Sequence, residues 1–279
     1  MKDNINILIG CYSFKSFTGS EVSFYELAIG LRELGHTVSI YSLNIGDPLV
    51  KKVEGITIEN ELSLNKKFFD VVIFSHGPVL WGTLKNIKAN KFINVIRSEV
   101  LPLEEPVIDK KVTAYVSIRP SIQSYLYTKY NIDSKLIYNP FDTSRYNKRL
   151  GKDRSRENRV VLFPGSLDYL RIQPIQFLLK MSDQQKYIVR HVGRCDYNIQ
   201  HHNFETHSPT DKMEEFYAEC DIVSGIFLGR TSIEGILCGK KVYQFDVDEK
   251  GNILKHYWHT ERDLGKFDKL VVAKQYTEI

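Results

Sequence analysis

The stretch that decides the fold lies near the C-terminal end. It reads Phe216-Tyr-Ala-Glu-Cys-Asp221, Ile222-Val-Ser-Gly-Ile-Phe227 and, after one leucine, Gly229-Arg-Thr-Ser-Ile-Glu-Gly-Ile-Leu-Cys-Gly-Lys-Lys-Val242. This order predicts the end of one helix, a short buried strand, a glycine turn and a second helix. Thr231 or Ser232 can cap that second helix, because a hydroxyl accepts a hydrogen bond from an unpaired backbone N–H. Gly239 stands where the helix is expected to end in a left-handed residue.

The same helix predicts a binding site for a nucleotide diphosphate. A helix N-terminus attracts phosphate, because its first N–H groups have no partners within the helix. Glu234 lies shortly after Gly229, so its carboxylate can accept hydrogen bonds from ribose hydroxyls. We therefore predict that Gly229, Arg230, Thr231 and Ser232 contact this ligand. The alternative for Glu234 is an exposed carboxylate that only the helix dipole favours.

Apolar runs and helical patterns alternate along the rest of the chain. Strands are predicted at 5–10, 37–41, 69–74, 92–96, 114–118, 135–138, 159–165, 187–192, 222–227 and 241–245, and helices at 21–34, 121–129, 173–181 and 211–219. Continuous apolar strands that alternate with helices indicate parallel sheets covered on both faces. Ligands of such sheets bind beyond the carboxyl ends of the strands.

The chain has 279 residues, enough for one large domain or two small ones. Residues 147–158 are polar and charged and lack apolar periodicity, which predicts a linker. We therefore expect two α/β domains, at residues 1–146 and 159–279.

Residues 216–242 resemble the donor-site signature of family four retaining glycosyltransferases, the glycogen synthase type. Gly229, Glu234, Gly239 and Lys240, followed by a valine at 242, match in register. The first glutamate of the family's E-x7-E pair is replaced by Ile226. The resemblance implies an α/β protein of the GT-B fold, with two Rossmann-like domains whose parallel sheets face each other across a cleft. Because family members usually run longer, it also implies a shortened C-terminal domain that binds the nucleotide sugar, and an N-terminal domain on the acceptor side.

The segment Gly165-Ser-Leu-Asp-Tyr-Leu-Arg171 resembles the family's diphosphate-binding loop. Arg171 falls on the family's lysine position and Ser166 on its arginine position. The resemblance implies that Arg171 and Glu234 are the catalytic pair and that Gly165, Ser166 and Gly193 bind the donor. A departing diphosphate needs such stabilisation, and Arg230 could replace the charge lost at 166. The alternative is that both arginines are solvated surface charges.

A third match is Ile137-Tyr-Asn-Pro-Phe-Asp-Thr-Ser-Arg-Tyr146, which resembles the family's segment between the two domains. Asn139, Asp142, Thr143 and the aromatic Tyr146 agree with it. The segment is either a hinge element near the binding site or a turn that only ends the first domain.

Five residues predict an acceptor side in the first domain. Gly19 and Ser20 occupy the family's loop before the first helix, where the alternative is that Ser20 caps the helix. His76, Arg97 and Arg119 end three strands on one rim and could bind an anionic group. The alternatives are a turn histidine with its own partner and arginines paired with Glu99, Glu104 or Glu105.

Charge, cysteine and histidine content bear on the class of ligand, on metal binding and on cellular location. The net charge of +4 is compatible with anionic ligands but does not identify nucleic acid. The cysteines at 11, 195, 220 and 238 show no metal-binding spacing and predict buried free thiols, as in the cytoplasm. No signal peptide or membrane span is visible. The histidines at 201, 202, 256 and 259 lack carboxylate or cysteine spacing, so no metal is predicted.

We predict a cytoplasmic retaining glycosyltransferase that moves a sugar from a nucleotide-diphosphate sugar, its co-substrate, to a glycan or lipid-linked saccharide. No further cofactor is expected. One alternative acceptor is a modified base in DNA, which the short chain, a pI near 8.7, abundant tyrosine and the arginines allow. Another alternative, motivated by Ile226, Ser166 and Arg97, is a degenerate protein that binds a nucleotide sugar without turnover. The sequence does not indicate the oligomeric state.

Overall fold

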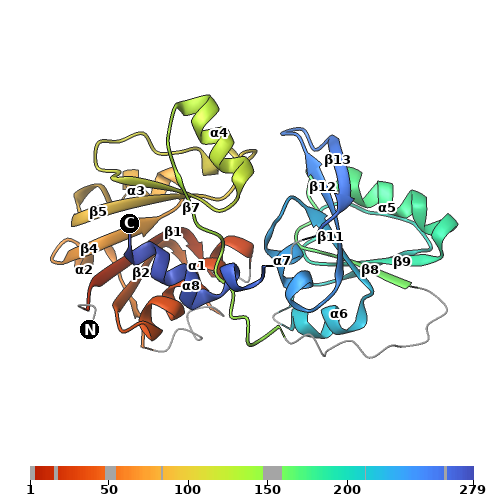
Figure 1. Ribbon diagram of the computed structural model, residues 1–279, viewed down its shortest axis with the longest axis horizontal. Helices are drawn as coiled ribbons and strands as arrows, with labels where there is room; N and C mark the ends of the chain where they lie inside the picture. The colour runs from red at the N-terminus through yellow and green to blue at the C-terminus, as the bar shows by residue number, and fades with distance from the viewer. Residues whose placement is uncertain are drawn as a thin grey trace. The chain divides into compact units, whose positions relative to one another are not determined.

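The computed structural model describes residues 4–15, 18–47, 55–82, 84–146, 159–210, 212–260 and 263–279 (Figure 1). The chain divides into two compact units, Met1–Asp142 with Gly265–Ile279 and Thr143–Leu264. We call these unit 1 and unit 2. The predicted linker at 147–158 lies outside the described residues. The predicted second domain at 159–279 needs correction, because its last segment belongs to unit 1.

Unit 1 is built on a parallel sheet of seven strands in the order β3-β2-β1-β4-β5-β6-β7. The strands are β1 (Asn6–Phe14), β2 (Thr37–Ile45), β3 (Thr57–Ile58), β4 (Phe68–Phe74), β5 (Lys88–Ile96), β6 (Ala114–Ser117) and β7 (Lys135–Leu136). Consecutive residues of the central strands are buried, as at Ile7, Leu8 and Ile9. Burial of successive residues means that both faces of the sheet are covered, which explains the continuous apolar runs.

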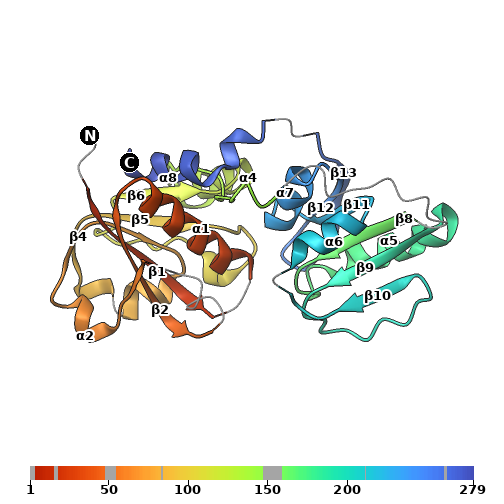
Figure 2. The ribbon, with the colours of Figure 1, turned by 90° about the horizontal axis from the view of Figure 1, so that it is seen from below.

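The helices of unit 1 cover this sheet (Figures 1 and 2). They are α1 (Gly19–Glu33), α2 (Glu61–Leu64), α3 (Gly77–Gly82), η2 (Leu84–Asn86), η3 (Pro102–Glu104), α4 (Pro120–Tyr130), η5 (Gly265–Phe267) and α8 (Lys269–Thr277). Phe24, Leu27 and Leu31 on α1 are buried at helical spacing. The N-cap of α1 is Thr18, so the idea that Ser20 caps this helix is wrong.

The C-terminal helix α8 packs against α1 and completes unit 1 (Figure 2). Val272, Ala273 and Tyr276 are buried in the same core as α1. Gly30 allows the close approach, because a Cβ there would lie 2.7 Å from the Lys269 carbonyl oxygen. The apolar face of α8 therefore needs α1 as its partner, which is why the last segment does not belong to unit 2.

Unit 2 contains a second sheet, in the order β10-β9-β8-β11-β12-β13. Its strands are β8 (Arg159–Pro164), β9 (Tyr187–Val192), β10 (Phe204–His207), β11 (Ile222–Ile226), β12 (Lys241–Val247) and β13 (Ile253–Trp258), and its helices are α5 (Ile172–Gln185), α6 (Met213–Glu219) and α7 (Arg230–Leu237). All pairs are parallel except β12 with β13. Gly235 lets α7 lie close to β11, since a Cβ there would be 2.8 Å from the Val223 side chain.

Each sheet reverses its winding beside its first strand. The chain moves outward from β1 to β3 and then returns to the other side of β1 as β4. In unit 2 it moves from β8 to β10 and returns beside β8 as β11. Parallel α/β sheets bind ligands outside the carboxyl ends of the strands at such switch points. In unit 2 the switch point lies between the loop after Pro164 and the turn after Ile226.

Three of the four cysteines are buried, in agreement with the prediction, whereas Cys195 is half-buried. Burial raises the pKa of the Cys11, Cys220 and Cys238 thiols to about 12. Since the thiolate is the reactive form, these three side chains are inert at neutral pH.

Candidate functional site

The loop after β8 and the loop after β9 touch through bare backbone at the switch point of unit 2. Gly165 and Gly193 have φ values of +111° and +152°, which favour glycine. A Cβ on Gly193 would overlap the carbonyl oxygen of Gly165. The two glycines predicted to bind the donor therefore lie together, and the loops leave backbone rather than side chains at this point.

A buried histidine holds this pair of loops through contacts with Gly165 and Thr206. His191, in β9, lies 2.8 Å through Nε2 from the Gly165 carbonyl oxygen and 3.0 Å through Nδ1 from Thr206 Oγ1. Burial lowers the pKa of His191, so the neutral ring is favoured. A neutral ring fits both contacts when Nε2 donates to the carbonyl and Nδ1 accepts from the hydroxyl.

Arg171 lies next to these glycines. It is the N-cap residue of α5 and pairs with Asp168. A Cβ on Gly165 would lie 4.0 Å from Arg171 Nε, so the guanidinium stands beside the loop. Its side chain is 27% exposed. Ser166 is half-buried in the same loop. The arrangement offers one cation, partly balanced by Asp168, at the rim of the switch point.

The turn that opens α7 is strained. Phe227 has a φ of +53°, which is uncommon for an aromatic residue. The N-cap of α7 is Gly229 without a side-chain cap, so the prediction that Thr231 or Ser232 caps the helix is wrong. The helix begins one residue before Thr231, and the Ser232 hydroxyl instead donates to the Phe227 carbonyl oxygen at 3.4 Å. The end of α7 is confirmed, since Gly239 follows it with a φ of +73°.

Glu234 is the centre of a buried hydrogen-bond network in unit 2. Only 6% of the residue is exposed. Its Oε1 accepts from Tyr146 Oη at 2.8 Å and from Arg230 Nε at 2.8 Å, and its Oε2 accepts from Tyr217 Oη at 2.7 Å. Arg230 Nη2 also donates to Tyr146 Oη at 3.4 Å. The idea that Glu234 is merely an exposed helix carboxylate is therefore wrong.

The Tyr217 hydroxyl keeps its proton in this network. Burial, followed by the nearby Glu234 carboxylate, raises the pKa of Tyr217 well above its usual value. Tyr217 is therefore a hydroxyl donor to a carboxylate acceptor. In this structure Arg230 balances the charge of Glu234, in addition to lying at the start of α7. Each carboxylate oxygen can accept about two hydrogen bonds, so Oε2 can accept one more donor.

In unit 1, Glu104 collects polar groups at the carboxyl ends of β4 and β5. Its Oε1 lies 3.0 Å from His76 Nε2, and its Oε2 accepts from Ser75 Oγ at 3.3 Å and from the Arg97 backbone N–H at 3.1 Å. His76 has a φ of +72°. Its Nδ1 accepts from the Tyr12 N–H at 3.4 Å, so Nε2 carries the ring proton and donates to Glu104. His76 is thus a turn histidine with its own partner.

The two arginines of this rim also bind groups of unit 1. Arg97 Nη1 donates to Asn139 Oδ1 at 2.9 Å, and its guanidinium lies 4.1 Å from the centre of the Phe24 ring. Arg119 pairs with Glu99. Both arginines and His76 are buried. The three residues end neighbouring strands on one rim, and the alternative interpretation holds for His76, which contacts Glu104, and for Arg119, which pairs with Glu99. The guanidinium of Arg97 instead donates to Asn139.

Comparison with solved structures identifies the architecture. HepE from Anabaena, in complex with UDP and glucose, matches 99% of this chain and 99% of its own, with a TM-score of 0.74 and 14% identity. A glycosyltransferase from Rickettsia africae matches 86% and 79%, with a TM-score of 0.59 and 18% identity. An alpha-glucosyltransferase in complex with UDP-glucose and DNA containing an abasic site matches 89% and 81%, with a TM-score of 0.58 and 11% identity. These proteins are GT-B glycosyltransferases. The chain has the GT-B fold.

The GT-B architecture predicted from the sequence is therefore confirmed. No protein-family model and no curated protein sequence matches the chain. HepE, matched from end to end, shows that a GT-B protein can have this compact length. Among the described residues, none of the helices has the length and apolar character needed to cross a membrane.

Three residues around the GT-B switch point of unit 2 were not among the predicted site residues. Tyr217 is within hydrogen-bond distance of Glu234, His191 of Gly165, and Asp168 of Arg171. Asp168 stands three positions before Arg171 in the turn that leads into α5, so the two opposite charges are close in sequence and could have indicated the pair. No local pattern marks Tyr217 or His191, because their partners come from other elements.

Proposed function

We propose that this protein is a retaining glycosyltransferase that transfers a sugar from a nucleotide-diphosphate sugar to a glycan or a lipid-linked saccharide. The observation that carries the proposal is the composition of the switch point in unit 2. Bare loop backbone at Gly165 and Gly193, the cation of Arg171 and the N-terminus of α7 all lie on this edge. Together these features suit a diphosphate. The Glu234 carboxylate, inside the same helix, suits the ribose.

The proposed sugar transfer requires few side-chain groups. The bond between the anomeric carbon and the diphosphate oxygen breaks, and an acceptor hydroxyl oxygen bonds to the same carbon from the same face. The acceptor proton passes to the departing diphosphate, so no side-chain base is needed. Negative charge grows on the diphosphate as the bond breaks, and fixed dipoles and cations lower the barrier most at that stage. We assign this role to Arg171 and the first N–H groups of α7.

The comparison with HepE makes UDP-glucose the first donor to test. We expect UDP to raise the melting temperature, because a ligand that binds only the folded chain stabilises it by about 2.7 kcal/mol at a hundredfold excess over its Kd. Glu234→Gln should weaken UDP binding by about 1–3 kcal/mol, since a hydrogen bond to a charged acceptor is lost. Glutamine retains one of the two acceptor oxygens, either the one that Tyr146 and Arg230 share or the one that Tyr217 uses, so this variant disturbs the network less than Glu234→Ala.

Arg171→Gln should reduce transfer much more than it reduces UDP binding, because its charge acts mainly on the departing diphosphate. Arg190→Gln is the matched control, since Arg190 is also an ion-paired arginine of unit 2 but lies within β9. Equal losses of activity in the two variants would contradict the role of Arg171. Absence of any stabilisation by UDP, GDP, ADP, CMP or dTDP would contradict the proposed donor class.

A second candidate acceptor is a modified base in DNA. The alpha-glucosyltransferase in complex with UDP-glucose and DNA favours it, since that protein has the same fold. Binding to DNA through phosphate contacts weakens steeply with salt. Transfer of labelled glucose to hydroxymethylated DNA, with salt-sensitive binding, would select this acceptor. Transfer to lipid-linked saccharides without DNA binding would select the first.

The last alternative is binding without turnover. Ile226, at the position of the family's first glutamate, is a buried apolar residue at the end of β11, so it offers no polar contact to a sugar. Release of glucose from UDP-glucose, even slowly, would exclude this alternative. We also propose a cytoplasmic location, because all four cysteines are free and three of them are buried thiols.

A further inference from the structure

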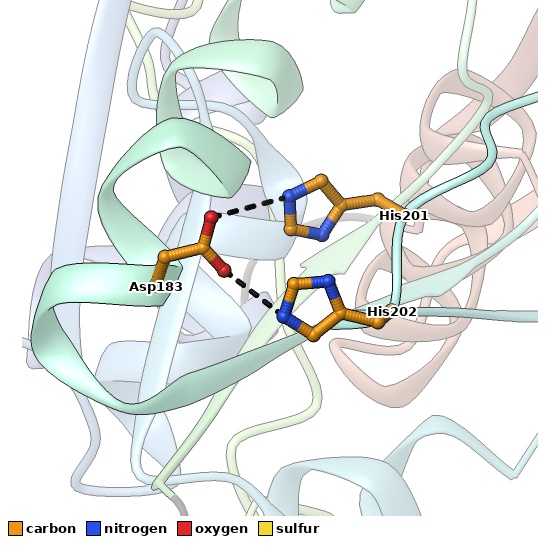
Figure 3. Close-up of side chains that lie close together, drawn as sticks. All are labelled: Asp183, His201 and His202. Atoms are coloured by element: carbon orange, nitrogen blue, oxygen red, sulfur yellow. Dashed lines mark ion pairs between the residues drawn. The ribbon is translucent and has the colours of Figure 1, made fainter.

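Two adjacent histidines and an aspartate come together in unit 2 (Figure 3). Asp183 lies in the last turn of α5, whereas His201 and His202 lie in the turn that leads into β10. Sequence spacing alone does not predict a carboxylate here, because Asp183 lies in α5, which is separated from the two histidines by β9. The folded chain supplies the third group that the histidine pair lacked.

The spacing of these groups fits a metal ion. His202 Nε2 lies 3.1 Å from Asp183 Oδ1, and His201 Nε2 lies 3.8 Å from Asp183 Oδ2. One ligand atom from each residue lies within 4.8 Å of the others. In a tetrahedral zinc site with bonds of about 2.1 Å, neighbouring ligand atoms are about 3.4 Å apart. The separations of 3.1 and 3.8 Å and the upper limit of 4.8 Å lie around this spacing.

We propose that Asp183, His201 and His202 bind one divalent transition-metal ion, with Zn²⁺ as the representative case. Two imidazole nitrogens and one carboxylate oxygen are ligands that zinc, copper and nickel accept, whereas calcium and magnesium prefer oxygen ligands alone. Three protein ligands leave a fourth position for water. The two imidazole rings are stacked, with an angle of 14° between their planes, so both can present Nε2 to the same side, as Figure 3 shows.

Neighbouring groups already hold the carboxylate. Asn203 Nδ2 donates to Asp183 Oδ1 at 3.0 Å and to Ser182 Oγ at 3.1 Å. Such outer contacts orient metal ligands. The Asn203 backbone N–H donates to His201 Nδ1 at 3.1 Å, so the ring proton of His201 is on Nε2. A metal at Nε2 moves this proton to Nδ1 and ends that contact. Only an ion that binds imidazole strongly offsets the loss of this hydrogen bond between the Asn203 N–H and His201 Nδ1.

We expect the ion to stabilise the fold and to take no part in sugar transfer. The turn at His201 precedes β10, so it lies at the amino edge of the parallel sheet, whereas the nucleotide site proposed above lies at the carboxyl edge. β10 is an edge strand that pairs only with β9 among the described strands. Metal binding would join this edge to the end of α5. We therefore expect it to stabilise unit 2 and to be independent of UDP.

The test is a zinc titration of the full-length chain, without an affinity tag and freed of metal by a chelator. Isothermal titration calorimetry with ZnCl₂ should give one site, and zinc should raise the melting temperature. His202→Ala and Asp183→Asn should each weaken the affinity at least about tenfold, since even loss of an outer contact costs that much. His207→Ala is the matched control, because His207 is an exposed histidine of β10 outside the cluster.

His202 is 75% exposed, so its replacement should leave the fold and the circular dichroism spectrum unchanged. Cobalt in place of zinc adds a direct readout, because its visible spectrum reports nitrogen coordination. Equal zinc affinity in the wild type, His202→Ala and Asp183→Asn would overturn the proposal by showing adventitious binding. So would the absence of a zinc site in a folded wild-type chain.

Discussion

For Glu234, the structure shows contacts that its position in the sequence did not predict. Its position after Gly229 marked it as a binding residue, but the structure adds that its charge is already balanced by Arg230 and oriented by two tyrosines. If Glu234 binds the ribose as proposed, a carboxylate held in this way loses little conformational freedom on binding, which favours affinity. The same arrangement means that substitutions here change stability and binding together, so the two must be measured separately.

Tyr217→Phe should destabilise the chain by about 2–3 kcal/mol, because it removes a buried hydrogen bond to a charged acceptor. Tyr187→Phe is the matched control. Its hydroxyl donates to the neutral Leu178 carbonyl oxygen at 2.6 Å, and its loss should cost about 1 kcal/mol. Urea denaturation of the two variants gives the comparison. Equal costs would mean that the charge of Glu234 adds nothing to the Tyr217 contact.

His191 should make the chain sensitive to acid. Burial lowers its pKa in the folded chain, so the unfolded chain, with the ordinary value near 6.5, binds the proton more readily. The stability that neutral His191 contributes is present above that ordinary pKa. It is lost as the pH falls from there through the folded pKa, at up to about 1.4 kcal/mol per pH unit.

His191→Gln should remove this part of the acid sensitivity, because glutamine can still donate to Gly165 but does not titrate. Urea midpoints at pH 8 and pH 5 measure the effect. The wild type should lose more stability between the two values than the variant. Parallel losses would show that His191 is not responsible.

At the scale of elements, the glycine pair after β8 and β9 sets the backbone shape of the proposed nucleotide site. Gly193→Ala would place a methyl group on the Gly165 carbonyl oxygen, in a backbone conformation that already disfavours alanine. We expect the substitution to lower the free energy of unfolding, measured by thermal unfolding, by more than about 3 kcal/mol. It should also abolish UDP binding. Gly35→Ala is the control, since its φ is +92° but no atom lies within 4 Å of the added methyl group. It should cost only about 1 kcal/mol of backbone strain.

The elements that the sequence predicted are those with buried faces. The central strands carry apolar residues on both sides, so β4, β8 and β9 were found with small errors at their ends. The edge strands β10 and β13 were missed, because their residues are mostly half-buried or exposed and show no apolar run. A strand that packs on one neighbour leaves little periodicity in its sequence.

For the whole molecule, the sequence predicted the GT-B fold from three short segments that resemble the family and from the alternation of strands and helices. It also placed Gly165 and Gly193 directly after strands and Glu234 in the helix that follows Gly229, as the structure has them, while their contacts with a donor stay predictions. It missed the contacts that tie distant segments, such as Tyr146 with Glu234 and Asp183 with the histidines. Periodicity describes what is buried, but it does not identify which buried group faces which. The sequence analysis left residues 265–279 in the second domain for the same reason, whereas the structure places them in unit 1.

The packing of α8 on α1 predicts that the C-terminal segment stabilises unit 1 and not unit 2. Ala273→Gln would bury a polar side chain in the core of unit 1, which should cost about 2–4 kcal/mol. Lys274→Gln is the matched control, since the neighbouring Lys274 is exposed and receives the same new side chain. Its cost should be below about 0.5 kcal/mol.

Each unit contains one tryptophan, Trp81 in unit 1 and Trp258 in unit 2. Replacing either by phenylalanine leaves a single fluorophore that reports on the unfolding of one unit. In the background that retains Trp81, Ala273→Gln should move the transition to lower urea. In the background that retains Trp258, the transition should stay at the same midpoint. An equal shift of both reporters would contradict the division, because it would mean that α8 supports the two units as one cooperative structure.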